Sequence, residues 1–258
     1  MTGPRLATRP AAWTAAIVLS VTGSGLVVGG GTAHAEDIDH LTAQQIADRS
    51  RDALLSAQSL HLSTRGDLGK GSTPMSLELT VDRDGNCNGS VDLGNSQGSA
   101  LIVKRGDDIW IKPDADFWKN QVPNGGSAFA AIVGDRYMKG SADDPRLSAL
   151  TKTCDLNTFQ KLVSDNANDD TGTLNKGAKT TLGKASVVPL TRMRDGTTLT
   201  LDVAATGKPY PLRLTIEGNG ADAAVGFSAF DEPVPRTTPS PADSFDVSAL
   251  LGRSTSPV

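Results

Sequence analysis

The sequence predicts an α+β fold, in which a long, curved antiparallel sheet of about ten strands forms an incomplete half-barrel that wraps helices. Two stretches of the chain alternate apolar and polar residues with a period of two, and clusters of glycine, asparagine and aspartate separate the short runs. Helical patterns precede and divide the two stretches. Each strand therefore has one apolar face, which the helices must cover. A plain β-sandwich is the alternative, but it leaves the helices without a role.

Residues 1–35 have the features of a secretory signal peptide. Arg5 and Arg9 precede an apolar stretch at 11–28, and Ala33-His34-Ala35 is a small-x-small cleavage site. A permanent membrane anchor is the alternative, but glycines interrupt the stretch and no stop-transfer charge cluster follows it. We expect cleavage after Ala35. Because no cysteine lies near the cut to accept a lipid anchor, we expect a secreted protein that is released.

The rest of the chain is expected to hold one domain at 36–232, followed by a Pro-rich strap and short tail at 233–258. The leader contains two of the 25 basic residues and none of the 29 acidic ones, which leaves a net charge of −6. This balance excludes nucleic acid as a partner, because such binding needs clustered Lys and Arg. We expect a monomer that makes transient contact with a membrane or the cell envelope.

The mature chain is expected to begin with a helix at 42–57. Thr42 is placed to be the N-cap, and Gln45 completes a capping box. Leu41 and Ile46 are spaced for a hydrophobic staple across the same helix end. The apolar residues that follow recur at helical spacing, so this helix presents one modest apolar face to the rest of the fold.

The first group of strands follows from Leu60. Apolar and polar residues alternate over 60–65, 77–82, 90–93 and 109–112, and 100–103 is a short apolar run. Turns are expected at Asp84-Gly85-Asn86, Gly94-Asn95 and Gly106-Asp107. Only a sheet with one wet face and one apolar face needs such alternation, which predicts antiparallel strands.

Helices and loops are expected in the middle of the chain, over 116–163. Asp144-Pro145 predicts a helix start with Asp as N-cap and Pro at N1, and Asp155 is expected to cap another helix. Strands resume after Thr171, and Asp195-Gly196 is a strong hairpin signal. The later alternation covers 198–203, 212–217 and 223–229.

The two cysteines, Cys87 and Cys154, lie in the part of the chain that is expected to be exported, where oxidation is permitted. An even count in an exported protein predicts a structural disulfide. The bridge would close a loop of 67 residues, which stabilises by roughly 4 kcal/mol in the chain-entropy model. Two free thiols are the alternative, but neither cysteine has a Cys-x-x-Cys partner.

No motif in the sequence predicts catalysis, a metal site or a cofactor. The mature chain has two histidines, His40 and His61, with no Gly-x-Ser-x-Gly elbow and no Cys/His cluster. The segment 82–86 resembles the start of a calcium loop, but Cys87 stands where that loop needs Gly and Leu93 where it needs Glu. A hairpin turn is the better interpretation of this segment, and we expect a non-enzymatic protein.

The remaining candidate site is the apolar face of the sheet itself. We expect it to line a ligand cavity with the following side chains, which share the apolar side of their strands: Leu77, Leu79, Val81, Val91, Leu93, Ile109, Ile111, Leu199, Leu201, Val203, Leu212, Leu214 and Ile216. An ordinary dry core is the alternative. The two are compatible, because a curved sheet can pack a helix at one end and leave a cavity at the other.

An early helix at 42–57 is followed by strands and then by Ile109-Trp110-Ile111-Lys112-Pro113-Asp114 with Phe117-Trp118. After the helical middle come Lys179-Thr180-Thr181-Leu182-Gly183 and Gly207-Lys208-Pro209-Tyr210-Pro211-Leu212-Arg213-Leu214. In this layout the chain resembles the LppX/LprG-type glycolipid-carrier lipoproteins and, more distantly, the LolA-type lipoprotein carriers. The resemblance implies a half-barrel sheet around an apolar cavity for acyl chains, and binding or transport without catalysis. The chain departs from that family because it lacks the anchoring cysteine.

The leading hypothesis is thus a secreted, non-enzymatic binder or carrier of a lipid or other amphiphile, with helices between Asp116 and Asn166 as a lid. An exported cell-envelope interaction or structural module with a fully packed core is the alternative, and the volume of the cavity discriminates between the two. An exported hydrolase is a third hypothesis, which needs a Ser or Asp beside His40 or His61 in a cleft.

Overall fold

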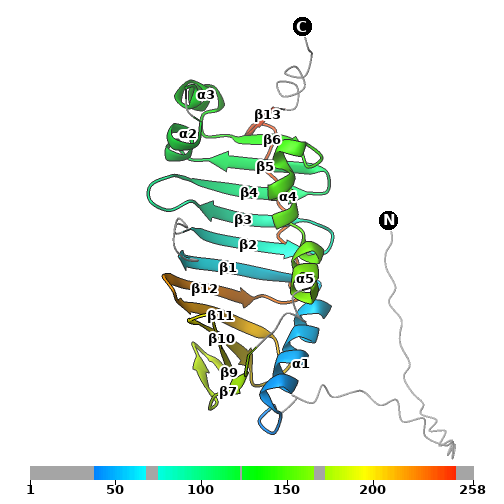
Figure 1. The fold of residues 1–258 in the computed structure, drawn as a ribbon. Helices are drawn as coiled ribbons and strands as arrows, with labels where there is room; N and C mark the ends of the chain where they lie inside the picture. Colours follow the sequence, from blue (N-terminus) through cyan, green and yellow to red (C-terminus); the bar gives the residue numbers. More distant parts are fainter. Residues whose placement is uncertain (1–37, 68–74, 123, 166–171, 248–258) are drawn as a thin grey trace, which may run out of the picture. The chain divides into compact units, whose positions relative to one another are not determined.

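The computed structural model describes residues 38–67, 75–122, 124–165 and 172–247. The expected signal peptide, its cleavage site after Ala35 and the last part of the tail lie outside these ranges. Within them the chain forms five α-helices, one 3₁₀ turn and a single unclosed sheet of thirteen strands (Figure 1). The predicted α+β class is confirmed.

The edge strands β7 and β13 have two and three residues, and the strands between them have five to ten. Their bounds are β1 (Ser59–Asp67), β2 (Ser76–Asp82), β3 (Cys87–Asp92), β4 (Ser99–Arg105), β5 (Asp108–Pro113), β6 (Tyr137–Ser141), β7 (Asn175–Lys176), β8 (Thr180–Leu182), β9 (Ala185–Arg194), β10 (Thr197–Ala204), β11 (Pro211–Gly218), β12 (Ala221–Ser228) and β13 (Ser244–Asp246). The sheet exceeds the expected ten or so strands partly because β6 and β13 lie in segments where no strand was expected.

The two groups of strands join at β1 and β12. The order is β13-β6-β5-β4-β3-β2-β1-β12-β11-β10-β9-β7, and β8 pairs with β9. Every pairing is antiparallel except that of β13 with β6. The Asp195-Gly196 hairpin forms as predicted, and both residues have positive φ, as a tight two-residue turn requires.

The register places the alternating apolar residues on one face. Leu62 of β1 lies opposite Leu79 of β2 and Phe227 of β12, while Leu214 of β11 lies opposite Val225 of β12. The same face continues through the paired residues of β3, β4 and β5. We call this the inner face, because the helices pack on it, and the opposite one the outer face.

The helices are α1 (Ala43–Ser56), α2 (Ala115–Gln121), α3 (Gly126–Val133), α4 (Ser148–Thr153) and α5 (Leu156–Asp165), with a 3₁₀ turn, η1, at Pro145–Leu147. The capping box of α1 is confirmed: the Gln45 N–H donates to Thr42 Oγ1 over 3.2 Å, and the Thr42 N–H donates to Gln45 Oε1 over 2.9 Å. A helical turn does begin at Pro145, where the sequence predicts a helix start, but it is the 3₁₀ turn η1 that precedes α4. The Leu147 N–H bonds to the Asp144 carbonyl, which closes a 3₁₀ turn first.

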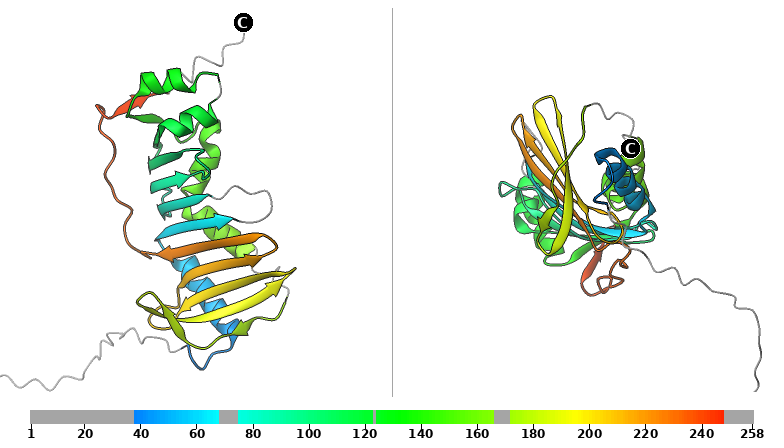
Figure 2. Two further views of the ribbon diagram at one scale, coloured as in Figure 1. Left: turned by 90° about the vertical axis from the view of Figure 1, so that its left-hand side faces the viewer. Right: turned by 90° about the horizontal axis from the view of Figure 1, so that it is seen from below.

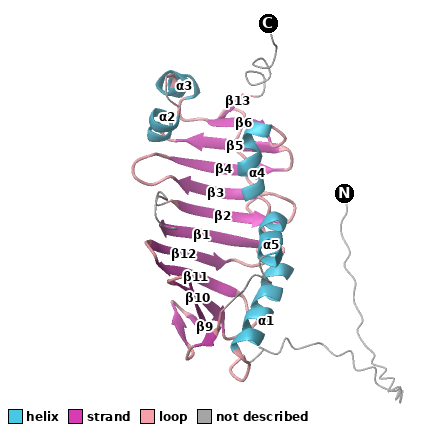
Figure 3. Cartoon of the chain, viewed as in Figure 1, coloured by secondary structure: helices cyan, strands magenta, loops and turns pink. Residues whose placement is uncertain are grey.

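The helices leave part of the inner face uncovered. In Figures 1 and 3, α1, α5 and α4 stack along one set of strand ends, whereas α2 and α3 lie at the opposite strand ends beside β4, β5 and β6. Seen from below in Figure 2, the sheet curves around α1. The curvature therefore creates a concave surface that the helices fill from one side.

Two apolar clusters form the core beneath the helices. One joins Leu54 of α1 and Leu156 of α5 to Leu60, Leu79 and Ile102 of the sheet. The other lies between the start of α1 and β9–β10, and its members are Ile38, Leu41, Ile46, Val188, Leu190, Val203 and Ala205. Both clusters lie on the covered part of the inner face.

Cys87 and Cys154 form the predicted disulfide, with their Cα atoms 5.2 Å apart. Cys87 begins β3 and Cys154 follows α4, so the bond fixes the helical middle of the chain to the sheet. Gln160 of α5 adds two hydrogen bonds, from Nε2 to the carbonyls of Leu54 and Ala57 at the end of α1. These links hold α1, α4 and α5 at one set of strand ends.

The segment after β12 crosses the outer face of the sheet. Residues 233–243 follow β12 after four further residues and lead to β13, where Ser244 pairs with Tyr137 of β6 (Figure 2). We call residues 233–243 the strap. Val234 within it is buried, and Val247 beyond β13 is buried as well.

Candidate functional site

The uncovered part of the inner face forms an apolar groove of about 570 Å³. It lies where β1 ends and where β2 and β12 begin, at the strand ends opposite α1. We call it the open groove, and its lining is Thr64, Arg65, Gly66, Met75, Leu77, Leu93, Gln97, Gln121, Ala223, Ala224 and Val225. Met75 is 42% exposed in the wall of this groove.

The rim of the open groove is built by α2 and the β3–β4 loop. Asp114 is the N-cap of α2: its Oδ1 accepts the Phe117 N–H over 2.7 Å, and its Oδ2 accepts the N–H and hydroxyl of Ser99. At the other end of α2, Gln121 Nε2 donates to Gln97 Oε1 over 3.2 Å. Asn120 donates to the Ser96 carbonyl over 2.7 Å. These exposed hydrogen bonds join α2 to the β3–β4 loop at the rim.

A second pocket of about 370 Å³ lies between the helices and the sheet. We call it the helix-side pocket, and it shares Val225 with the open groove. Phe159, Val163, Leu201, Leu214 and Phe227 form much of its wall, and Gln44, Asp48 and Arg51 of α1 lie at its edge. The rings of Phe159 and Phe227 are 6.1 Å apart between centroids, so α5 and β12 meet there. The shared residue makes the two pockets neighbours on one apolar surface.

Ser50 introduces one polar atom into the helix-side pocket. It lies on α1, is 1% exposed, and its hydroxyl has no hydrogen-bond partner within the described residues. Buried hydroxyls are normally paired, so an unpaired one in an apolar wall is available to a polar group of a ligand.

A third apolar pocket, of about 240 Å³, lies between β5, β6 and the helices α2 and α3. Ile109, Ile111, Trp118, Phe129 and Met138 line it. The rings of Trp118 and Phe129 are 5.1 Å apart between centroids, so aromatic packing closes much of this end of the sheet.

The structure distributes the predicted ligand-binding residues among different environments. Leu77 and Leu93 line the open groove, Leu201 and Leu214 the helix-side pocket, and Ile109 and Ile111 the third pocket. Leu79, Val81 and Val203 are buried core residues, and Val91 packs against the core. Leu199, Leu212 and Ile216 are half-buried strand residues, with Leu212 beside a register shift between β10 and β11. The predicted set thus lies partly in pockets and partly in core.

Several pocket residues are missing from the predicted set. Ala223, Val225 and Phe227 of β12 alternate in the sequence like the others, and this pattern could have added them. Met75 and Gln121 carry no such signal, since one precedes a strand and the other ends a helix. Their place at the groove depends on the pairing of β12 with β1 and on the packing of α2.

The polar cluster around His61 lies on the outer face. His61 Nε2 is 3.0 Å from Glu78 Oε2 and its Nδ1 is 3.1 Å from Thr80 Oγ1, while Arg65 reaches Glu78 over 3.6 Å. Cross-strand pairing explains this arrangement without a substrate. Across the described ranges, no group of three or more His, Cys, Asp or Glu side chains is placed to hold a metal ion. None of the helices in those ranges is long and apolar enough to span a bilayer.

No protein-family model matches the sequence, and no curated protein matches it significantly. Solved structures do match. LprF from Mycobacterium bovis is 14% identical, with a TM-score of 0.52 over 77% of this chain and 97% of LprF. The lipoprotein LppX from Mycobacterium tuberculosis is 16% identical, with a TM-score of 0.48 over 76% of this chain and 98% of LppX. The chain shares the fold of LprF, and the resemblance expected from the sequence is confirmed for the fold.

Proposed function

We propose that this protein is a non-enzymatic binder or carrier of a lipid or another amphiphile, which it holds in the open groove and the helix-side pocket. The observation that carries this proposal is the partial cover of the inner face. The two neighbouring pockets, of about 570 and 370 Å³, have walls made largely of apolar side chains and share Val225. Ligand sites in proteins are typically apolar concavities of roughly 300–1,000 Å³ with a few polar groups.

The driving force would be the removal of acyl surface from water. Each buried CH₂ contributes about 0.8 kcal/mol, so a C16 chain contributes on the order of 10 kcal/mol before ordering costs. The hydroxyl of Ser50 and the amides of Gln97 and Gln121 supply hydrogen-bonding groups at the inner end and at the rim. An amphiphile with an apolar tail and a polar linkage fits this division.

Binding of a fluorescent C16 fatty acid tests the proposal directly. Val225→Asp places a charge where the two pockets meet, and we expect affinity to fall about tenfold or more, because burying an unpaired carboxylate is costly. Ser228→Asp on the same strand is the control, since Ser228 is exposed on the outer face opposite His61. Urea unfolding of both variants establishes that they are folded. Equal affinity of the two variants would reject the groove as the binding site.

Native mass spectrometry of protein purified from its own host identifies the ligand class. A co-purifying lipid supports the carrier. A clean apo mass, together with no fatty-acid binding, would favour the alternative, an exported cell-envelope interaction or structural module.

We further propose that residues 1–35 direct export and are removed after Ala35, so that a monomer is released. N-terminal sequencing of protein from the culture medium should begin at Glu36. A first residue before Ala35, or recovery only in the membrane fraction, would contradict this.

The α2 rim is the part of the expected lid that reaches the open groove. We propose that its movement admits the ligand. Replacing Gln97 and Gln121 by cysteines and joining them with a short bismaleimide should slow fatty-acid exchange, since the native cysteines are already paired. Unchanged exchange after complete cross-linking would reject this role.

A further inference from the structure

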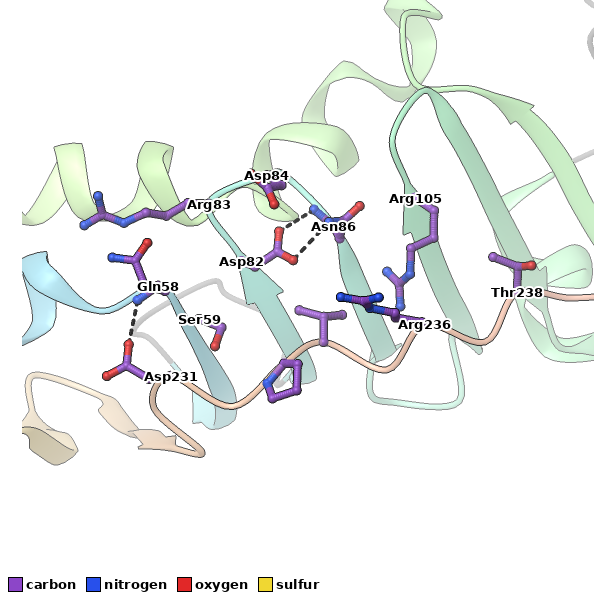
Figure 4. Close-up of a pocket in the computed structure, with 12 residues that line it drawn as sticks. Gln58, Ser59, Asp82, Arg83, Asp84, Asn86, Arg105, Asp231, Arg236 and Thr238 are labelled. Carbon is purple, nitrogen blue, oxygen red and sulfur yellow. Dashed lines mark hydrogen bonds between the residues drawn. The ribbon is translucent and has the colours of Figure 1, made fainter.

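A separate pocket of about 650 Å³ lies on the outer face, beneath the strap (Figure 4). It is bounded by the start of β1, the end of β2, the start of the β2–β3 hairpin, the end of β4 and the strap itself. None of its lining residues lines the open groove or the helix-side pocket. Its wall contains three arginines, Arg83, Arg105 and Arg236, and three aspartates, Asp82, Asp84 and Asp231.

Three of these six charged side chains already have hydrogen-bond partners. Asp82 accepts two hydrogen bonds from Asn86, from the backbone N–H over 2.8 Å and from Nδ2 over 3.0 Å. Asp231 accepts the Gln58 N–H over 2.7 Å and the Tyr210 hydroxyl over 2.6 Å. Arg83 donates to the Ala57 and Leu55 carbonyls at the end of α1. These three side chains therefore organise the walls of the pocket.

Arg105 differs from them. Its Nη1 donates to the carbonyls of Cys87 and Lys104, but Nε and Nη2 are buried and have no acceptor among the described residues. Burial lowers the pKa of Arg105, and the nearby charge of Asp82 opposes this without forming an ion pair with it in the described structure. A guanidinium offers five donors in a fixed fork, and here two of its three nitrogens remain unsatisfied. Arg105 is half-buried as a residue, and its two unsatisfied, buried donor nitrogens favour an anionic acceptor.

The strap brings a second arginine to the same pocket. Its origin is anchored to β1, because Ser59 Oγ donates to the Glu232 carbonyl and Asp231 holds the Gln58 N–H. Val234 is buried, so the strap packs against the sheet two residues before Arg236. Figure 4 shows Arg236 extending from the strap into the pocket toward the side occupied by Arg105. Among the residues that the structure describes, no carboxylate forms an ion pair with Arg236. Thr238 adds a hydroxyl to the same wall of the pocket.

We propose that the pocket beneath the strap binds a phosphate-type oxyanion between Arg105 and Arg236. The two guanidinium groups match the geometry of phosphate oxygens and can bind them in a bidentate manner. A phosphate group has three or more acceptor oxygens, so it can accept hydrogen bonds from both guanidinium groups at once, which a single carboxylate does less readily. The anion would also join the strap to β4. This inference is independent of the fatty-acid site on the inner face.

Isothermal titration with inorganic phosphate tests the site at pH 7.5, with sodium chloride at matched ionic strength as the blank. We expect wild-type protein to bind phosphate, and Arg236→Gln and Arg105→Gln each to lower the affinity about tenfold or more, because each removes charge-assisted hydrogen bonds. Arg194→Gln is the matched control: Arg194 is exposed at the end of β9 and outside the pocket. Arg236 is also exposed, so its variant reports on binding without disturbing the core.

Vesicles separate the two sources of a phosphate group. Phosphatidylcholine vesicles are compared by co-sedimentation with vesicles that also contain about 20% phosphatidic acid, an anionic content at which electrostatic recruitment is measurable. Arg-dependent binding to inorganic phosphate identifies a free phosphate site, and Arg-dependent binding to phosphatidic acid alone identifies a headgroup site. No binding to either probe, or binding that both pocket variants retain, would overturn the proposal. Fatty-acid affinity should stay unchanged in Arg236→Gln, which keeps this result distinct from the test of the open groove.

Discussion

The two ends of the inner face have the same strand pattern and different environments. Leu79 and Leu77 lie two residues apart on β2 and point to the same side of the sheet. Leu79 is 0% exposed beneath α1 and α5, whereas Leu77 is half-buried in the wall of the open groove. The position of the helices, and not the strand sequence, decides which part of an apolar face becomes core and which remains available to a ligand.

A disulfide and side-chain hydrogen bonds explain why α1, α4 and α5 stay at one set of strand ends. The disulfide holds the end of α4 to β3, Gln160 holds α5 to the end of α1, and Arg83 holds the β2–β3 hairpin to the same end of α1. At the other end the rim consists mainly of side-chain hydrogen bonds between α2 and the β3–β4 loop. The covered end should therefore be the more stable of the two, and the open end the more adaptable.

Removing the disulfide should have the largest effect on this contrast. Replacing both Cys87 and Cys154 by alanine should lower the free energy of unfolding by about 4 kcal/mol, because the loop of 67 residues is no longer closed in the unfolded chain. Urea denaturation measures the loss. Hydrogen exchange should rise in α4 and α5 well before it rises at the rim. A loss below about 1 kcal/mol would show that other contacts hold the cover.

The pair Leu79→Ala and Leu77→Ala compares the two ends directly. We expect Leu79→Ala to lower the free energy of unfolding by about 3 kcal/mol, since it leaves a cavity in a closed core. Leu77→Ala should cost much less, because its site is already partly open, but it should weaken fatty-acid binding. The same strand, residue type and face make each variant the control for the other. Equal destabilisation, with no difference in binding, would mean that the open groove behaves as core.

The sequence predicts the apolar face well, because the period of two is local information. The alternation around Leu62, Leu79 and Leu214 is enough to identify the inner face, and the register of the strands confirms it. The capping box at Thr42 and the Asp195-Gly196 turn are equally local, since each depends on residues within one turn of each other. The alternation, the capping box and the turn are each determined by residues that are close together in the sequence.

The sequence does not divide that face into core and groove. Leu79 and Leu77 are indistinguishable by pattern. The packing of α1 and α5 buries Leu79 fully, whereas Leu77 lies at the edge of the same cluster and lines the groove. Alternation identifies Val225 as an apolar-face residue, but its place in the groove depends on the pairing of β12 with β1 across more than 150 intervening residues, which periodicity does not encode. The parallel strand β13 has only three residues and follows a Pro-rich segment, so its signal is weaker than that of its neighbours.

A substitution of Asp114, the N-cap of α2, tests how the rim of the open groove is stabilised. Asp114→Ala should lower the free energy of unfolding by about 1 kcal/mol, the usual effect of losing an N-cap. Burial raises the pKa of Asp114, but hydrogen bonds from Phe117 and Ser99 outweigh it and leave the pKa below its usual value. The contribution is thus complete above the unfolded pKa of about 3.9 and is lost as the pH falls through the lower folded pKa.

Urea titrations from pH 7 to pH 2 measure this dependence. The difference between wild type and Asp114→Ala should be constant down to about pH 4 and shrink below it. Asp116→Ala is the control, because Asp116 lies in the first turn of the same helix. A difference between wild type and Asp114→Ala that persists undiminished at the lowest pH would contradict a role for the carboxylate.

A change at Ser50 should have the smallest effect on the free energy of unfolding, and it should raise that free energy where the other changes lower it. Ser50 is buried like a core residue, but it also lines the helix-side pocket. Ser50→Ala removes a hydroxyl that has no partner in the described structure, so the ligand-free protein should become more stable by roughly 0.5–1 kcal/mol. Ser56→Ala on the same helix is the control, since its hydroxyl donates to the Ala53 carbonyl over 2.8 Å and its loss removes that bond. Urea unfolding of the two variants in ligand-free form measures the difference. A stability loss in Ser50→Ala as large as that in Ser56→Ala would show that the Ser50 hydroxyl is satisfied in the folded protein, and the helix-side pocket would then have no unpaired polar atom to offer a ligand.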